Sequence, residues 1–260
     1  TRLCIDCDAY WGTDISERAV TSLLTARRDA DDVCDIHLMT QPAHEPLSAE
    51  VSVPAFDVAV VNSVAQYFPG AGYLVRVVEQ LAAAVTASPT AGGRIFVGDL
   101  RSHRHLRHFH AAVHAHKLSM HASSPTASAL HGALDIAIVE ENELCVDPTM
   151  LLAVGAHAHL HLERTRVLLK HGSADNELNA FRYDIVLFVG TALPPTAPAD
   201  ATGELIWTTN KENGATSLDA LRGMVAQSLG GGRQFVIVRG VPNLLLTEAH
   251  SLLHQLNSAS

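Results

Sequence analysis

The sequence predicts an α/β protein built on a doubly wound, mostly parallel sheet. Short apolar segments alternate with amphipathic helical segments over the first hundred residues, which is the pattern of βαβ units. Three of the apolar segments run into a polar residue, at Asp14, Asn62 and Asp99. Polar residues at the carboxyl ends of parallel strands mark the edge where α/β sheets bind ligands. We therefore expect a ligand site at that edge.

Apolar periodicity defines the expected elements in order. The expected strands are 9–12, 33–39, 56–61, 94–98, 158–170, 181–189, 204–208 and 234–239. The expected helices are 15–28, 73–85, 106–118, 127–139, a short one from 148, 217–229 and 246–256. Ser16 and Asp147 are predicted N-caps, because their side-chain oxygens can accept from the first free amides of a helix. Residues 171–179 are expected to be a loop between antiparallel strands, and the proline-rich stretch 193–202 a linker.

Composition excludes several classes of function. The formal charge of −9 argues against nucleic acid as a main partner, since a phosphate-binding face needs a basic excess. No apolar run is long enough to span a bilayer, and the first residues do not resemble a signal peptide. The four cysteines, Cys4, Cys7, Cys34 and Cys145, are interpreted as reduced thiols of a cytoplasmic protein. A redox or half-zinc role for Cys4 and Cys7 is the alternative.

The 16 histidines are unusually many for 260 residues. Seven of them lie within 101–121, and His157, His159 and His161 alternate along an expected strand. Alternate residues of a strand share one face, so the three could bind a metal ion. The interpretation we prefer is the polar face of an outer strand, and we expect no metal. A His-rich metal-binding hydrolase stays open as a less favoured function.

The end of the first strand allows both a chemical and a structural interpretation. The carboxylate of Asp14 could accept both hydroxyl protons of a ribose diol, or it could cap the following turn. Tyr67 could plug the core beneath the following helix, and the acidic cluster 140–143 could be a solvated helix end.

Several segments together resemble one family. They are YWGTDIS, VVNSVAQYFPGAGYLVRVVEQL and GGRIFVGDLRS, followed in order by EENELCVDPTML, the turn at 170–172, NELNAFRYDIVL and RGVPNLLL. Their order and spacing cover nearly the whole chain and resemble the methyltransferase domains embedded in nonribosomal peptide synthetases. That family is similar in fold to Class I S-adenosylmethionine-dependent methyltransferases. Its members methylate an amino acid held as a thioester on the phosphopantetheine arm of a carrier domain, most often at the α-amine.

The resemblance implies a cofactor, partners and roles for individual residues. The cofactor is S-adenosylmethionine, and the partners are a peptidyl carrier domain and an adjacent adenylation domain. The implied cofactor-binding residues are Asp14, Ile15, Ala43, His44, Asn62, Ser63 and Val64. Tyr67, Asn62 and Glu143 are the candidate catalytic residues, and Asn176, Glu177, Arg182 and Tyr183 are expected on the substrate side.

The chain departs from the family pattern in two places. The family's first motif, a strand ending in a glycine-rich loop of the form E-x-G-x-G-x-G, has no counterpart before Asp14. An Ala-Asp pair expected after the second strand of this chain is replaced by 41–45, QPAHE, which leaves His44 as the adenine partner. We therefore expect an N-terminally incomplete methyltransferase core at 1–192 with lid helices at about 101–155. A C-terminal α/β extension follows at 203–260, and a non-catalytic scaffold is the main alternative function.

Overall fold

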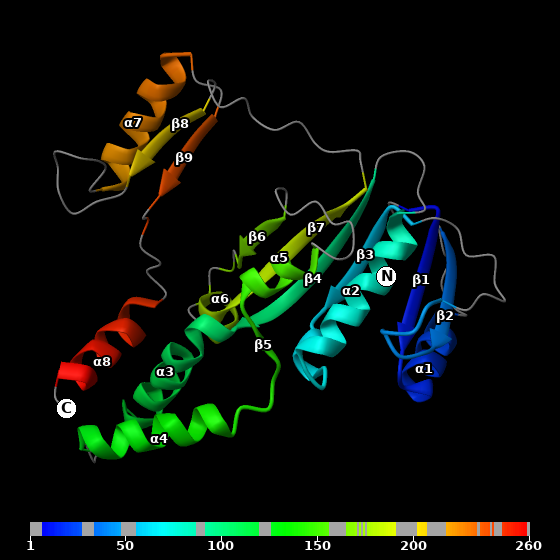
Figure 1. Ribbon diagram of the computed structural model, residues 1–260, viewed down its shortest axis with the longest axis horizontal. Coiled ribbons are helices and arrows are strands. Elements are labelled where there is room, and N and C mark those ends of the chain that lie inside the picture. Colours follow the sequence, from blue (N-terminus) through cyan, green and yellow to red (C-terminus); the bar gives the residue numbers. More distant parts are fainter. Residues whose placement is uncertain are drawn as a thin grey trace. The chain divides into compact units, whose positions relative to one another are not determined.

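The structure is a computed structural model that describes residues 7–27, 34–47, 56–86, 92–119, 126–155, 165–170, 172, 174, 176–190, 202–206, 217–232, 235–239, 241 and 246–258. It divides into two compact units (Figure 1). Unit 1 contains residues 1–103, 142–168 and 183–191, and unit 2 contains residues 104–141, 169–182 and 192–260. Each unit is described by itself.

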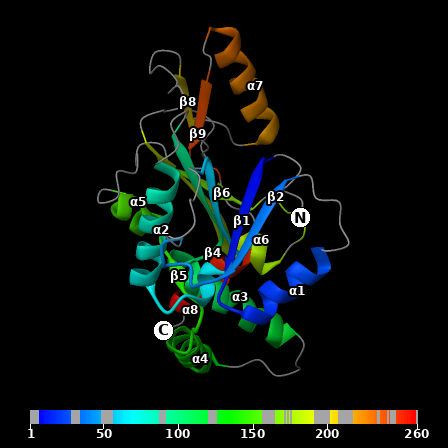
Figure 2. The same cartoon turned by 90° about the vertical axis from the view of Figure 1, so that its right-hand side faces the viewer.

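Two βαβ pairs form the framework of unit 1. Strand β1 (Ala9–Asp14) pairs in parallel with β2 (Asp35–Thr40), and helix α1 (Glu17–Arg27) connects them. Strand β3 (Val58–Asn62) pairs in parallel with β4 (Gly93–Ser102), connected by α2 (Ala71–Thr86). Figure 2 shows α1 beside β1 and β2. These pairs confirm the predicted α/β class with parallel strands.

The second sheet continues from β4. Its strand order is β3-β4-β7-β6, where β7 is Arg182–Val189 and β6 is Arg166–Leu169, and the short strand β5 (Cys145–Val146) also pairs in parallel with β4. Helix α5 (Pro148–Gly155) follows β5. Among the strands that the structure describes, no hydrogen-bonded ladder joins β1 to β3, so β1–β2 is a separate two-stranded sheet. Trp11 of β1 meets Phe56, two residues before β3, edge-on with the ring centroids 6.2 Å apart.

The core of unit 1 lies between α2 and the β3–β4 strands. The apolar face of α2 recurs every three or four residues, as an amphipathic helix requires, and its members are completely or almost completely buried: Leu74, Val77, Val78, Ala82 and Val85. They pack on alternate residues of the strands, among them Val61, Ile95 and Val97. This packing fixes the carboxyl end of β3, where Asn62 and Ser63 follow.

Unit 2 contains a group of packed helices and a separate βαβ unit. Helices α3 (Leu106–Ser119), α4 (Ala127–Val139) and α8 (Thr247–Ser258) share a small core of Ala111, Leu130, Leu134, Leu253 and Leu256. Helix α6 (Glu177–Phe181) contacts α3 through Phe181, whose ring meets Phe109 at 5.6 Å. The βαβ unit consists of β8 (Thr202–Ile206), α7 (Leu218–Gly230) and β9 (Phe235–Arg239), with the two strands parallel (Figures 1 and 2).

The structure confirms the predicted caps. Ser16 Oγ accepts from the Ala19 amide at 3.2 Å, and Asp147 Oδ1 accepts from the Thr149 amide at 2.9 Å. Two expectations were wrong, and one strand was missed. Strand β4 runs on to Ser102, so Asp99 lies inside it rather than at its end, with φ at +67°. The predicted loop 171–179 overlaps α6, which begins at Glu177, because Asn176 Oδ1 caps it by accepting from the Asn179 amide at 3.0 Å. Strand β5 was not predicted, because two residues carry no periodic signal.

No described helix has the length and apolar character needed to cross a membrane.

Candidate functional site

The turn after β3 contains most of the predicted cofactor-side residues of unit 1. Asn62, Ser63 and Val64 are all exposed. Ser63 has φ at +58°, a left-handed conformation that is uncommon for a residue with a side chain and that concentrates at functional sites. Its amide donates to the Gly98 carbonyl of β4 at 3.3 Å. The turn is thus a strained, solvent-facing edge held against the neighbouring strand.

Tyr67 lies in the short 3₁₀ helix η2 (Ala65–Tyr67) that follows this turn. Its side chain is 75% exposed, so the alternative of an aromatic plug in the core is wrong. The phenol is accessible to a substrate.

The turn after β1 carries Asp14, Ile15 and Ser16. Asp14 Oδ1 accepts from the Ser16 amide at 2.8 Å, so one carboxylate oxygen does cap the turn. A carboxylate has about four acceptor positions, so this bond leaves capacity for the ribose role. The Ile15 side chain is 76% exposed beside it, an apolar surface against which a planar ring can pack.

The loop after β2 bonds to the β1 turn and contacts helix α2. The Gln41 amide donates to the Asp14 carbonyl at 2.9 Å. His44 Nδ1 lies 3.0 Å from the Tyr73 hydroxyl at the start of α2, and the Tyr73 ring packs on Phe68 at 4.7 Å between centroids. Because Nδ1 of His44 contacts Tyr73, Nε2 is the ring atom that could contact an adenine. Ala43 packs at the margin of the core.

Glu143 is held in an ion pair. Its carboxylate lies 3.1 Å from the guanidinium of Arg101, near the end of β4. The Arg101 side chain is 7% exposed and that of Glu143 is 27% exposed. Within unit 2, Glu141 lies 3.3 Å from His110 Nε2, and both side chains are largely buried. The view of 140–143 as a solvated helix end is therefore wrong for Glu141 and Glu143.

The residues expected on the substrate side fall in two units. In unit 2, Asn176 caps α6, and Glu177 lies 3.9 Å from the buried Arg182. In unit 1, the buried Tyr183 donates its hydroxyl to the Val146 carbonyl at 2.8 Å. Burial, with smaller contributions from Asp147 and Cys145, raises the pKa of Tyr183 well above 10. Its hydroxyl therefore stays protonated and serves as a donor to the backbone.

Within unit 1, hydrogen bonds and ring contacts connect the predicted residues in one series. The β1 turn bonds to the 41–47 loop, that loop contacts Tyr73 of α2, and Tyr73 packs on the residue after η2. The Leu144 amide then donates to the Gln66 carbonyl at 2.8 Å, which places the residue next to Glu143 against η2.

Sequence reasoning missed Arg101 and Gln66 as functional candidates. Arg101 lies in the last residues of β4, beyond its apolar run, and its ion pair with Glu143 spans more than forty residues that no local pattern connects.

No cluster of metal-ligating side chains occurs among the residues whose positions are described. His157, His159 and His161 lie outside those residues, as does Cys4 of the Cys4–Cys7 pair.

No protein-family model matches the chain. Curated proteins, however, are similar to it in sequence. A probable non-canonical nonribosomal peptide synthetase, CymA of Salinispora arenicola, is 37% identical over 192 residues, which is 74% of this chain and 2% of the relative. Chondramide synthase cmdD of Chondromyces crocatus is 33% identical over 239 residues, 92% of this chain and 6% of the relative. Nonribosomal peptide synthetase kk1B of Curvularia clavata is 34% identical over 184 residues, 70% of this chain and 1% of the relative. The chain thus spans only a small part of each of these relatives.

Solved structures show weaker likeness. The N-methyltransferase NodS of Bradyrhizobium japonicum matches 73% of this chain and 78% of its own at 11% identity, with a TM-score of 0.43. A S-adenosylmethionine-dependent methyltransferase of Methanosarcina mazei matches 70% of this chain and 82% of its own at 14% identity, with a TM-score of 0.42.

The family assignment follows from the sequence motifs, the parallel α/β framework and the identity with these synthetases. The chain belongs to the family of methyltransferase domains of nonribosomal peptide synthetases.

Proposed function

We propose that this chain methylates an aminoacyl thioester tethered to a peptidyl carrier domain, at the α-amine, with S-adenosylmethionine as the methyl donor. The observation that carries the proposal is the exposed, strained turn Asn62–Val64 together with exposed Asp14 and Ile15, each at the carboxyl end of a parallel strand. A neighbouring adenylation domain and a cytoplasmic location belong to the same proposal.

The side chains of unit 1 fit this cofactor. The Asp14 carboxylate has acceptors for the two ribose hydroxyls, and the exposed Ile15 offers an apolar surface to the adenine. His44, with Ala43 beside it, would contact the adenine through Nε2, and Asn62 with the backbone at Ser63–Val64 would hold the methionine portion. When bound, S-adenosylmethionine supplies a methyl group that is already activated by a positive sulfonium.

The protein's task is then to position a neutral amine. The thioester lowers the basicity of that amine, so a strong base is not required, and placement supplies most of the rate. Asn62 and Tyr67 orient the amine and its approach, and the Glu143 carboxylate accepts its proton. Asn176, Glu177, Arg182 and Tyr183 contribute to the side that meets the aminoacyl arm, Tyr183 through the backbone at Val146.

No described hydrogen bonds join the β1–β2 sheet to β3, and the test of the proposal follows from this gap. Both β1 and β3 end their described sheets, and Val58 and Val60 of β3 are about half exposed. We propose that an additional strand with a glycine-rich loop completes the cofactor site between them.

Calorimetry with S-adenosylmethionine is the deciding experiment, on this chain and on a longer polypeptide that supplies such a strand on its N-terminal side. We expect binding to the longer polypeptide, lost in Asp14→Ala and kept in Asp219→Ala, whose carboxylate is exposed on α7. A longer polypeptide that binds no cofactor and transfers no methyl group would favour the non-catalytic scaffold. Tyr67→Phe with unchanged methyl transfer and unchanged affinity would remove its hydroxyl from the reaction.

A further inference from the structure

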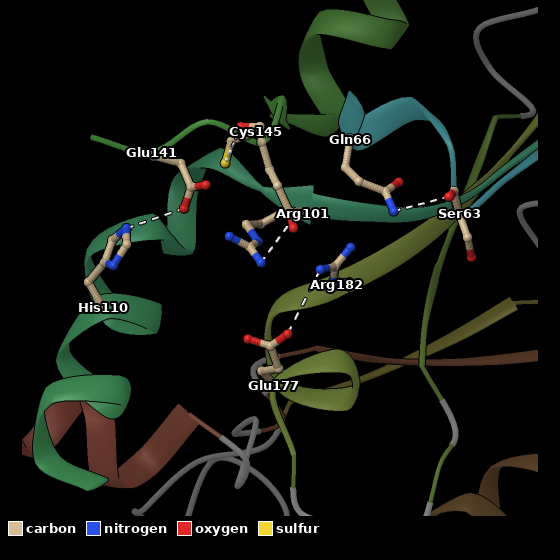
Figure 3. Close-up of polar contacts among 9 residues, drawn as sticks. Ser63, Gln66, Arg101, His110, Glu141, Cys145, Glu177 and Arg182 are labelled. Atoms are coloured by element: carbon tan, nitrogen blue, oxygen red, sulfur yellow. Dashed lines mark hydrogen bonds and ion pairs between the residues drawn. The ribbon is translucent and has the colours of Figure 1, made fainter. Parts of the chain in front are cut away.

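Gln66 is a buried polar side chain that the proposed reaction does not use. Only 4% of it is exposed, although it lies one turn beyond the solvent-facing residues Asn62–Val64. Its Nε2 donates to the Ser63 carbonyl at 3.1 Å (Figure 3). Because that carbonyl can only accept, the amide must present its nitrogen there.

This orientation leaves Gln66 Oε1 inside the protein with no hydrogen-bond partner among the described residues. A buried acceptor without a donor is unfavourable, and an apolar side chain of the same length would avoid it. Packing alone therefore does not explain a glutamine at this position. The hydrogen bond that its side-chain amide donates to the Ser63 carbonyl does explain it.

Ser63 needs that donor because its backbone is left-handed. The residue is fixed on both sides, by its own amide bonded to Gly98 and by its carbonyl bonded to Gln66. Side chains rarely adopt this conformation unless the surroundings enforce it. Gln66 thus helps to hold the turn in shape.

The main chain of Gln66 contacts a second segment. Its carbonyl accepts from the Leu144 amide at 2.8 Å, and Leu144 follows Glu143, whose carboxylate pairs with Arg101. One residue therefore bonds the Ser63 turn through its side chain and the Glu143 segment through its backbone. Displacement of either segment would strain the hydrogen bonds through which Gln66 connects it to the other.

We propose that Gln66 is a positioning residue that holds the Asn62–Val64 turn in its cofactor-binding shape and couples that turn to the segment carrying Glu143. The role assigned to the turn rests on the proposed function, whereas the coupling itself does not. The position of the Glu143 segment then depends on the conformation of the Asn62–Val64 turn.

The test compares Gln66→Met with Gln80→Met, the same chemical change on the partly exposed side of α2. Methionine keeps the length and volume but removes the donor to Ser63. We expect amide hydrogen exchange at Ser63 and Leu144 to become about tenfold faster in Gln66→Met without any ligand, while the melting temperature stays close to that of the wild type. In the longer polypeptide we expect affinity for S-adenosylmethionine to weaken about tenfold and kcat to fall, with Gln80→Met unchanged in all readouts.

The outcomes separate the two proposals. If the wild type binds no cofactor, the proposed function fails, and exchange at Leu144 still decides whether Gln66 couples the segments. If the wild type is active and Gln66→Met keeps both its affinity and slow exchange at Leu144, the coupling is overturned and the proposed function stands. A lower melting temperature with unchanged affinity and exchange would make Gln66 merely structural and would also overturn it.

Discussion

The turns after β1 and β3 carry neighbouring parts of the proposed cofactor site, yet different contacts hold them. The first is closed mainly by its own side chains, since Asp14 accepts from the Ser16 amide and Ser16 accepts from the Ala19 amide, although the Asp14 carbonyl also accepts from Gln41. The second depends on distant partners, because the Ser63 amide bonds to Gly98 and Gln66 connects the turn to Leu144. The side-chain bonds of the β1 turn can form without distant segments, whereas the β3 turn requires β4 and the 142–146 segment to be folded against it.

The largest effect should come from the distant support of the β3 turn. Glu143→Ala leaves the buried Arg101 guanidinium without the carboxylate at 3.1 Å, and breaking such a pair costs about 3 kcal/mol of unfolding free energy. Urea unfolding measures this loss. Hydrogen exchange at Leu144 should accelerate as well, because the segment that bonds to Gln66 is released.

Glu177→Ala is the matched control, since Arg182 is equally buried. Its carboxylate is 46% exposed and 3.9 Å away, so we expect a loss of less than about 1 kcal/mol. Equal losses in the two variants would show that the Arg101 pair gives the β3 turn no special support.

Gly98→Ala acts on the β3 turn directly. The added methyl group would meet Asn62 Oδ1 and the Phe96 ring, so Asn62 has to move. We expect about 2 kcal/mol of destabilisation, as for other overpacked sites, and about tenfold weaker cofactor binding in the longer polypeptide.

Gly93→Ala, at the other end of β4, provides the control. Its added methyl group would meet Val85, far along the strand from the turn, so stability should fall while affinity stays unchanged. Affinity lost equally in both variants would mean that Asn62 is not the reason for the loss.

The β1 turn should separate stability from binding. Asp14→Asn keeps an oxygen for the Ser16 amide but loses the charge, so we expect little change in stability and about tenfold weaker cofactor binding. Ser16→Ala removes the helix cap and should cost about 1 kcal/mol with affinity unchanged. Calorimetry and urea unfolding on both variants check the two effects. Parallel losses of both quantities would show that this turn, like the β3 turn, couples binding to folding.

The same contrast explains what could be predicted from the sequence. Helix α4, the cap at Ser16 and the strand before Asn62 were placed correctly, because each depends on a local periodicity or a side chain three residues from its partner. Strand β5, the extension of β4 beyond Asp99 and the Arg101–Glu143 pair were not predictable in this way, since each requires a partner more than forty residues away. The left-handed backbone of Ser63 also has no local signal, because glycine, not serine, is the residue that usually marks it.

The smallest expected effect is a pH dependence of stability. It should affect the helices of unit 2 and leave both turns unchanged. Burial lowers the pKa of His108 below 6.5, and the neighbouring His105 and His250 lower it further. His108 stacks on His250 of α8 with ring centroids 5.8 Å apart, and its Nδ1 is buried without a hydrogen-bond partner among the described residues. A lowered folded-state pKa means that the unfolded chain binds the proton first as pH falls. The contribution of neutral His108 to stability is therefore present above pH 6.5 and is lost as pH falls below it through the folded-state pKa.

Hydrogen exchange should show that α3 and α8 lose protection below pH 6.5 while the β3 turn keeps its protection. The variant His108→Gln should flatten this pH dependence more than His254→Gln does. If Leu144 lost protection in step with α8, the β3 turn would depend on more distant structure than its bonds to Gly98 and Gln66 indicate.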